Sequence, residues 1–115
     1  MIEERRRYPR YKADIEVEYD VENAVEIESK PHTYNISSVG VQIPVNKAVR
    51  PGKKVRLKMK ISEDKEIQAE GRIVWKRPID KNLVQEENAG VEFVRMNDDS
   101  RDALSGYIQT LTNGA

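Results

Sequence analysis

Apolar and charged residues alternate strictly in two stretches of this chain, at 13–19 and 55–61. In the second stretch Val55, Leu57 and Met59 are separated by Arg56 and Lys58. A period of two places the apolar side chains on one face of a strand and the charged side chains on the other. We therefore expect half-buried β-strands that present one face to a core and the other to water.

The same period recurs along most of the chain. The runs that we expect to be strands cover 13–19, 25–36 with a break at Pro31, 39–43, 55–61, 67–75 and 89–93. In the fifth run Ile73 and Trp75 share one face, and the connections are expected at 44–52 and 77–88.

The end of the chain changes period. Leu104, Tyr107, Ile108 and Leu111 follow the i, i+3, i+4, i+7 spacing of an amphipathic helix, predicted over about 98–112. The side chains expected to cap its first turn belong to Asp98, Asp99 and Ser100. Six short strands followed by one helix indicate a mainly β fold, a six-stranded antiparallel barrel with the helix over an opening or an edge.

Composition limits the possible functions. The 115 residues fit one domain, and 20 Lys and Arg balance 20 Asp and Glu, so the whole molecule has no strong attraction to nucleic acid or acidic lipid. There is no cysteine and one histidine, His32, which gives no reason to expect a metal site, a cofactor or an enzyme. No apolar run approaches a membrane span, so we expect a cytoplasmic protein without membrane insertion.

Positive charge is concentrated at "RRRYPRYK", residues 5–12. Pro9 disfavours a helix here, and in an extended arm Arg6 and Arg10 point the same way, about 13 Å apart. Their guanidinium groups can fork onto phosphate oxygens or a guanine edge. The alternative is a solvated arm whose charges pair with neighbouring glutamates.

A second polar cluster, "NISSVG" at 35–40, lies between two expected strands. It can be an ordinary turn, in which Asn and Ser bond nearby backbone and Gly adopts a positive φ. It can also be an anion cradle, in which Ser37 offers a hydroxyl, Gly40 allows a ligand close to the main chain, and Asn35 bonds a base edge. These residues alone leave both readings open.

Together the two clusters resemble the PilZ domain family, bacterial receptors for the second messenger cyclic di-GMP. The family is marked by R-x-x-x-R in an N-terminal arm and [D/N]-x-S-x-x-G at a strand junction. Here the first motif runs from Arg6 to Arg10 and the second from Asn35 to Gly40. "GRIVW" at 71–75, "AGVEF" at 89–93 and the closing helix extend the resemblance over nearly the whole chain.

The resemblance implies a nucleotide-binding module of second messenger signalling, in which a flexible arm, residues 1–12, wraps over a barrel, residues 13–115. Arg6 and Arg10 would contact phosphates and guanine edges, and Asn35 would bond a guanine in a place where Asp is commoner. Ser37 and Gly40 would position the ligand. The ligand-ordered arm would then signal to a downstream protein that the sequence does not identify.

Other residues could add to this site. Similar proteins with a basic residue just before the first motif arginine, here Arg5, bind a stacked pair of cyclic di-GMP molecules, and Arg7 and Ser38 adjoin the motif residues. Trp75 either packs in the core beside Ile73 or forms an aromatic wall against a guanine.

Two other functions stay open. One is a small barrel that binds single-stranded nucleic acid through its basic arm, although the glutamates on the strand faces disfavour a long polyanion. The other is a PilZ-like protein-interaction domain that no longer binds nucleotide. The intact motif residues argue against this alternative.

Overall fold

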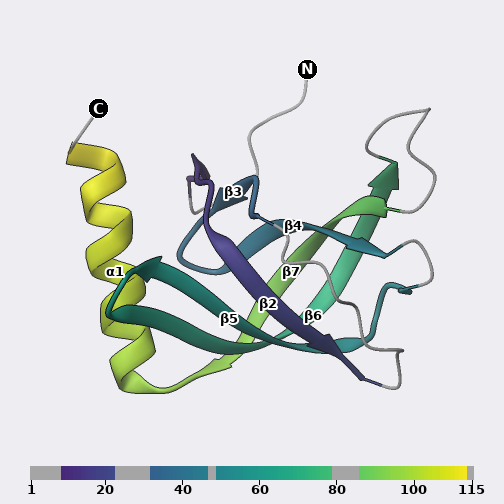
Figure 1. Ribbon diagram of the computed structural model, residues 1–115. Helices are drawn as coiled ribbons and strands as arrows, with labels where there is room; N and C mark the ends of the chain where they lie inside the picture. The colour runs from purple at the N-terminus through teal and green to yellow at the C-terminus, as the bar shows by residue number, and fades with distance from the viewer. Residues whose placement is uncertain (1–8, 23–31, 47–48, 79–85, 114–115) are drawn as a thin grey trace.

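The computed structural model describes residues 9–22, 32–46, 49–78 and 86–113, and these form one antiparallel sheet with one helix (Figure 1). The sheet has the strand order β1-β3-β4-β7-β6-β5-β2. The elements are β1 (Tyr11–Lys12), β2 (Glu16–Val21), β3 (Asn35–Ile36), β4 (Gly40–Asn46), β5 (Lys54–Ser62), β6 (Lys65–Pro78), β7 (Glu86–Met96) and α1 (Asp98–Asn113).

The two outermost strands of the sheet, β1 and β2, follow one another along the chain. The sheet therefore curls round into a half-barrel, which confirms the predicted mainly β fold with a C-terminal helix. Seven strands are described where six were expected, because the end of the arm, Tyr11–Lys12, forms an additional short strand, β1, that pairs with β3, whereas β2 of the first alternating run pairs with β5. The part of the second run at 25–31 lies outside the described residues.

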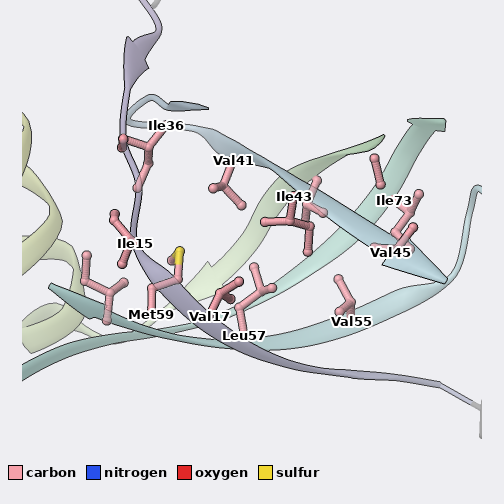
Figure 2. Packing of buried hydrophobic residues seen from close by; sticks show 14 of the residues in the cluster. Ile15, Val17, Ile36, Val41, Ile43, Val45, Val55, Leu57, Met59 and Ile73 are labelled. Atoms are coloured by element: carbon pink, nitrogen blue, oxygen red, sulfur yellow. The ribbon is translucent and has the colours of Figure 1, made fainter. Parts of the chain in front are cut away.

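Alternate residues of every long strand fill the inside of the curl. Figure 2 shows the aliphatic side chains of facing strands pointing toward one another. Val17, Ile36, Ile43, Leu57, Met59 and Ile67 are completely or almost completely buried. The alternation in the sequence thus correctly predicted which residues of β2, β4 and β5 form the core.

The outer faces of β2 and β5 carry opposite charges. In each pair the acidic residue of β2 stands directly across from a basic residue of β5, and the pairs are Glu16 with Lys60, Glu18 with Lys58 and Asp20 with Arg56. Such cross-strand pairs contribute roughly 0.2 to 1 kcal/mol each. The balanced charge of the chain therefore reflects, in part, a sheet face on which acidic and basic residues face each other.

Thr33 joins the two ends of the curl where the chain passes from β1 to β2. Its backbone N–H donates to the carbonyl of Ile15 (2.9 Å), and the N–H of Ile15 donates to Thr33 Oγ1 (3.1 Å). The Thr33 hydroxyl in turn donates to the carbonyl of Ala13. Thr33 is only 4% exposed, so these backbone groups need partners within the protein. Its side chain replaces the ladder hydrogen bonds that are missing between β1 and β2.

The start of α1 corrects the expected capping. Asn97, rather than Asp98, Asp99 or Ser100, caps the helix, because its Oδ1 accepts from the N–H of Ser100 (2.8 Å). The buried Ser100 hydroxyl instead accepts the N–H of Gln68 in β6 (3.0 Å). This bond ties the first turn of α1 to the sheet.

The helix packs against the sheet through one face. Leu104 is 3% exposed in the core, and the partly buried Tyr107, Ile108 and Leu111 pack against it. Burial, and secondarily the nearby carboxylate of Asp14, raises the pKa of Tyr107 above its ordinary value. The predicted apolar stripe is therefore the contact face of the helix.

Replacing Thr33 by valine should destabilise the fold, because it leaves the N–H of Ile15 and the carbonyl of Ala13 buried without their partner. We expect a loss of about 1 to 3 kcal/mol in the free energy of unfolding, measured by urea denaturation. Thr110→Val is the matched control, since the hydroxyl of Thr110 is exposed on α1, and it should change stability by less than about 0.5 kcal/mol. Equal stability of the two variants would contradict this role of Thr33.

Candidate binding site on the outer face of the sheet

Two β-bulges interrupt the pairing of β6 with β7. Ile73 pairs with Val91 and Trp75 with Gly90, which leaves Val74 as an extra residue on β6. A second bulge lies between Glu70 and Gly71, where Val94 is the extra residue on β7. The two extra valines are among the most exposed large apolar side chains of the described chain, at 48% for Val74 and 60% for Val94.

The bulge at Val74 reverses the alternation of β6. Ile73 points into the core, and without the bulge Trp75 would follow it. Instead Trp75 lies opposite Gly90 on the outer face, where its ring is 4.8 Å from the guanidinium carbon of Arg77. The expectation that Ile73 and Trp75 share a face is wrong. The outward position of Trp75 is consistent with the alternative expectation, in which its ring forms an aromatic wall against a guanine.

Gly90 makes room for the indole of Trp75. A methyl group at this position would overlap the indole ring, with Nε1 and Cε2 nearest. The ring therefore lies against the backbone of β7 at Gly90 and remains partly exposed. A side chain held in this way is a rigid aromatic surface on the outside of the sheet.

The cavity beside Trp75 spans the outer faces of four strands. Cross-strand partners place Asn35 of β3, Gln42 of β4, Gly90 of β7 and Trp75 of β6 in one row. A hollow of ≈ 220 Å³ lies over this row. Its lining also includes Arg10, Ser37, Val39, Gly40, Val74 and Glu92.

The segment 37–40 forms a tight turn at the edge of this cavity. Ser37 Oγ accepts the N–H groups of Val39 (3.1 Å) and Gly40 (3.2 Å), and the Ser37 N–H donates to the carbonyl of Gly40 (2.8 Å). The Ser37 hydroxyl bonds nearby backbone as the turn reading expected, but Gly40 does not adopt the positive φ that this reading assigned to it. A Cβ at Gly40 would overlap the carbonyl oxygen of Val91, so glycine is required by the close approach of β7.

Strand pairing brings the end of the arginine arm to the same place. Tyr11 pairs with Ile36 and Lys12 with Asn35, so continuing the register places Arg10 beside Ser37. Arg10 is exposed and lines the cavity. The structure thus brings together Arg10, Asn35, Ser37, Gly40 and Trp75 of the residues that the sequence singled out.

Other candidates are not brought to the cavity by the described structure. Arg5, Arg6 and Arg7 lie outside the described residues. Ser38 is exposed in the turn and does not line the cavity.

Sequence reasoning missed Gln42, Glu92 and Gly90 as parts of this surface. Gln42 and Glu92 stand between buried residues of β4 and β7, where a polar residue is ordinary on a wet face. Gln42 could have been found from the sequence, because strands joined by a tight turn pair side by side. The motif residue Asn35 and Gln42 lie on two such strands and are cross-strand partners.

The described residues hold no group of three or more His, Asp or Glu side chains arranged to bind a metal ion. Among the helices found in those residues, none is long and apolar enough to cross a bilayer.

A family model of the PilZ domain matches residues 4–110. This chain belongs to the PilZ domain family. The match spans the arm, the sheet and most of α1, so this PilZ domain accounts for nearly all of the sequence. A search of curated protein sequences finds no match.

Solved structures share the fold of this PilZ domain. Bacillus subtilis inhibitor of motility, MotI/DgrA, superposes with a TM-score of 0.73 at 21% identity, over 97% of this chain and 53% of that one. The PilZ domain of Escherichia coli YcgR with c-di-GMP gives 0.68 at 15%, over 96% and 94%. The K. pneumonia MrkH–c-di-GMP complex gives 0.75 at 14%, over 97% and 53%, so this chain spans about half the length of MotI and MrkH.

Replacing Gly90 by alanine in this PilZ domain should displace the indole of Trp75. Because Trp75 is the single tryptophan, its fluorescence emission should move to longer wavelength as the ring leaves the backbone of β7. The crowding should also lower the free energy of unfolding by about 1 to 3 kcal/mol.

Gly106→Ala is the control for this substitution. Nothing lies near the added methyl group on α1, so the emission should stay unchanged and the helix should gain about 0.5 to 1 kcal/mol. An unchanged emission maximum in Gly90→Ala would contradict the contact between Gly90 and Trp75.

Proposed function

We propose that this PilZ domain is a receptor for cyclic di-GMP that binds the ligand on the outer face of its sheet. The observation that carries the proposal is the single cavity lined by Arg10, Asn35, Ser37, Gly40 and Trp75. These residues come from the arm, the 35–40 segment and a bulged strand, far apart in sequence, and they supply the groups that a guanine nucleotide requires.

Each of these groups has a distinct part in binding. The guanidinium of Arg10 pairs with a phosphate or with the O6 and N7 edge of guanine. Asn35 hydrogen-bonds a base edge. The face of Trp75 stacks on a base, and the exposed Val39 and Val74 extend that apolar surface.

The small volume of the cavity supports a second part of the site on the arm. A drug-sized ligand usually occupies about 300 Å³ or more, whereas this hollow has ≈ 220 Å³. The cavity therefore takes part of the dinucleotide, and residues 1–12 cover the rest. Arg5, Arg6 and Arg7 are the residues of this arm that we assign to the phosphates.

Charge supplies part of the energy for a useful affinity. One close ion pair near a protein surface is worth roughly 4 kcal/mol before desolvation and ordering costs, and a micromolar complex needs about 8 kcal/mol net. Two such pairs supply roughly 8 kcal/mol before these costs, so a micromolar complex also requires base stacking on Trp75 and the hydrogen bonds of the cavity.

The receptor acts as a switch in bacterial second messenger signalling. Binding orders the arm over the outer face, and the new surface is read by an unidentified downstream protein in the cytoplasm. The domain binds its ligand without transforming it, so we assign it no catalytic residue. Arg5, next to the first motif arginine, would allow the arm to hold a stacked pair of ligands.

Calorimetric titration with cyclic di-GMP tests the proposal. Wild-type protein should bind, and Arg6→Ala and Arg10→Ala should each weaken binding by about tenfold or more, since each removes charge-assisted hydrogen bonds. The matched control is Arg101→Ala on α1, which removes an exposed arginine that does not line the cavity and should leave the affinity unchanged.

The outcomes of this titration distinguish the proposed function from the two alternatives. If wild type gives no heat at tens of micromolar cyclic di-GMP, the proposal is wrong and the protein-interaction alternative takes its place. If single-stranded DNA or RNA binds instead, with losses in Arg6→Ala and Arg10→Ala and none in Arg101→Ala, the arm is a nucleic-acid contact.

A further inference from the structure

The side chains of Asn35 and Gln42 form an amide pair on the floor of the cavity. They are cross-strand partners on β3 and β4, and Asn35 Nδ2 donates to Gln42 Oε1 at 2.7 Å. Both residues are half-buried and line the hollow. The bond uses one donor of Asn35 and one acceptor of Gln42, so turning either amide alone by half a turn would break it.

The pair leaves one acceptor and one donor for a ligand. Because Nδ2 of Asn35 is directed at Gln42, the Asn35 Oδ1 oxygen is the end that remains to accept. The Nε2 group of Gln42 likewise remains to donate. In the described part of the chain neither atom has another hydrogen-bond partner.

We infer that Gln42 is a positioning residue that holds Asn35 with its carbonyl toward the ligand and so makes the cavity select guanine over adenine. The inference rests on the proposed cyclic di-GMP site and names what determines its base specificity.

The chemistry of the two bases explains the selection. The Watson–Crick edge of guanine carries the N1–H and N2–H donors, which a fixed carbonyl oxygen accepts. Adenine presents an acceptor at N1, which would face that oxygen without a donor between them. The carboxylate of Glu92, also in the lining, is another acceptor and favours the same base.

A free asparagine would discriminate poorly, because rotating its amide by half a turn exchanges the acceptor for a donor. Gln42 opposes that rotation, because turning Asn35 alone would bring its Oδ1 against Gln42 Oε1 and break the hydrogen bond. An aspartate at position 35 would have two equivalent oxygens and would need no partner to orient it. Comparing Asn and Asp at position 35 therefore distinguishes orientation of Asn35 by Gln42 from a purely structural role of Gln42.

The test is calorimetry with cyclic di-GMP and cyclic di-AMP on wild type, Gln42→Leu, Asn35→Asp and the double variant. Gln42→Leu should weaken cyclic di-GMP binding by about tenfold and leave cyclic di-AMP binding unchanged or stronger, so that the preference for guanine falls by about tenfold or more. In the Asn35→Asp background the same Gln42→Leu change should alter cyclic di-GMP affinity by less than about threefold.

Two further variants control the experiment. Gln42→Glu keeps an acceptor for Asn35 Nδ2 and should keep the preference for guanine. Gln68→Leu makes the same substitution on the exposed face of β6, away from the cavity lining, and should change neither affinity. An equal loss of both ligands in Gln42→Leu, or an undiminished loss in the Asn35→Asp background, would overturn the inference.

The ligand-free protein gives a readout that does not depend on the proposed function. In nuclear magnetic resonance spectra one Nδ2 proton of Asn35 should exchange slowly with solvent in wild type and rapidly in Gln42→Leu. If wild type binds neither dinucleotide, the receptor proposal fails while this measurement still decides the amide pair. Asn35 side-chain resonances that are the same in both proteins would contradict the positioning role.

Discussion

The pairing of β6 with β7 determines what both faces of this sheet present. Side chains alternate with a period of two, so one extra residue exchanges inside for outside along the rest of a strand. The extra Val74 turns Trp75 outward, and the extra Val94 places Arg95 on the outer face while Met96 packs against the core. The candidate binding surface therefore depends on a bulge, and the pairing of β1 with β3 brings Arg10 to the same surface.

Close backbone contacts then shape the cavity. Gly90 lets the indole of Trp75 lie on β7, and Gly40 lets the 37–40 turn approach the carbonyl of Val91. Because Ser37 uses its hydroxyl within that turn, the turn is rigid and its contribution to a ligand comes from its shape and backbone. The polar side chains that line the cavity include Arg10, Glu92 and the amides of the row beside Trp75.

The sequence predicted the parts of the fold that follow from a regular period. Alternation identified the core of β5, the apolar stripe identified α1, and the motifs identified Arg10 and the 35–40 segment, which the structure places at one cavity. The alternation of Ile73 with Trp75 is indistinguishable from that of an unbulged strand, so the bulge at Val74 could not be predicted. The hydrogen bonds of Thr33 could not be predicted either. They join Thr33 to a segment 18 residues away, and Thr is common in any strand.

The central claim is that the ligand binds over the row that runs from Asn35 to Trp75 on the outer face. The most direct measurement is a titration of ¹⁵N-labelled protein with cyclic di-GMP followed by nuclear magnetic resonance. We predict the largest shifts at the backbone amides of Gly40 and Gly90 and at the indole N–H of Trp75, with Gly52 and Gly106 unchanged. Saturable shifts confined to Gly52, Gly106 or α1, with the Trp75 indole unmoved, would contradict it.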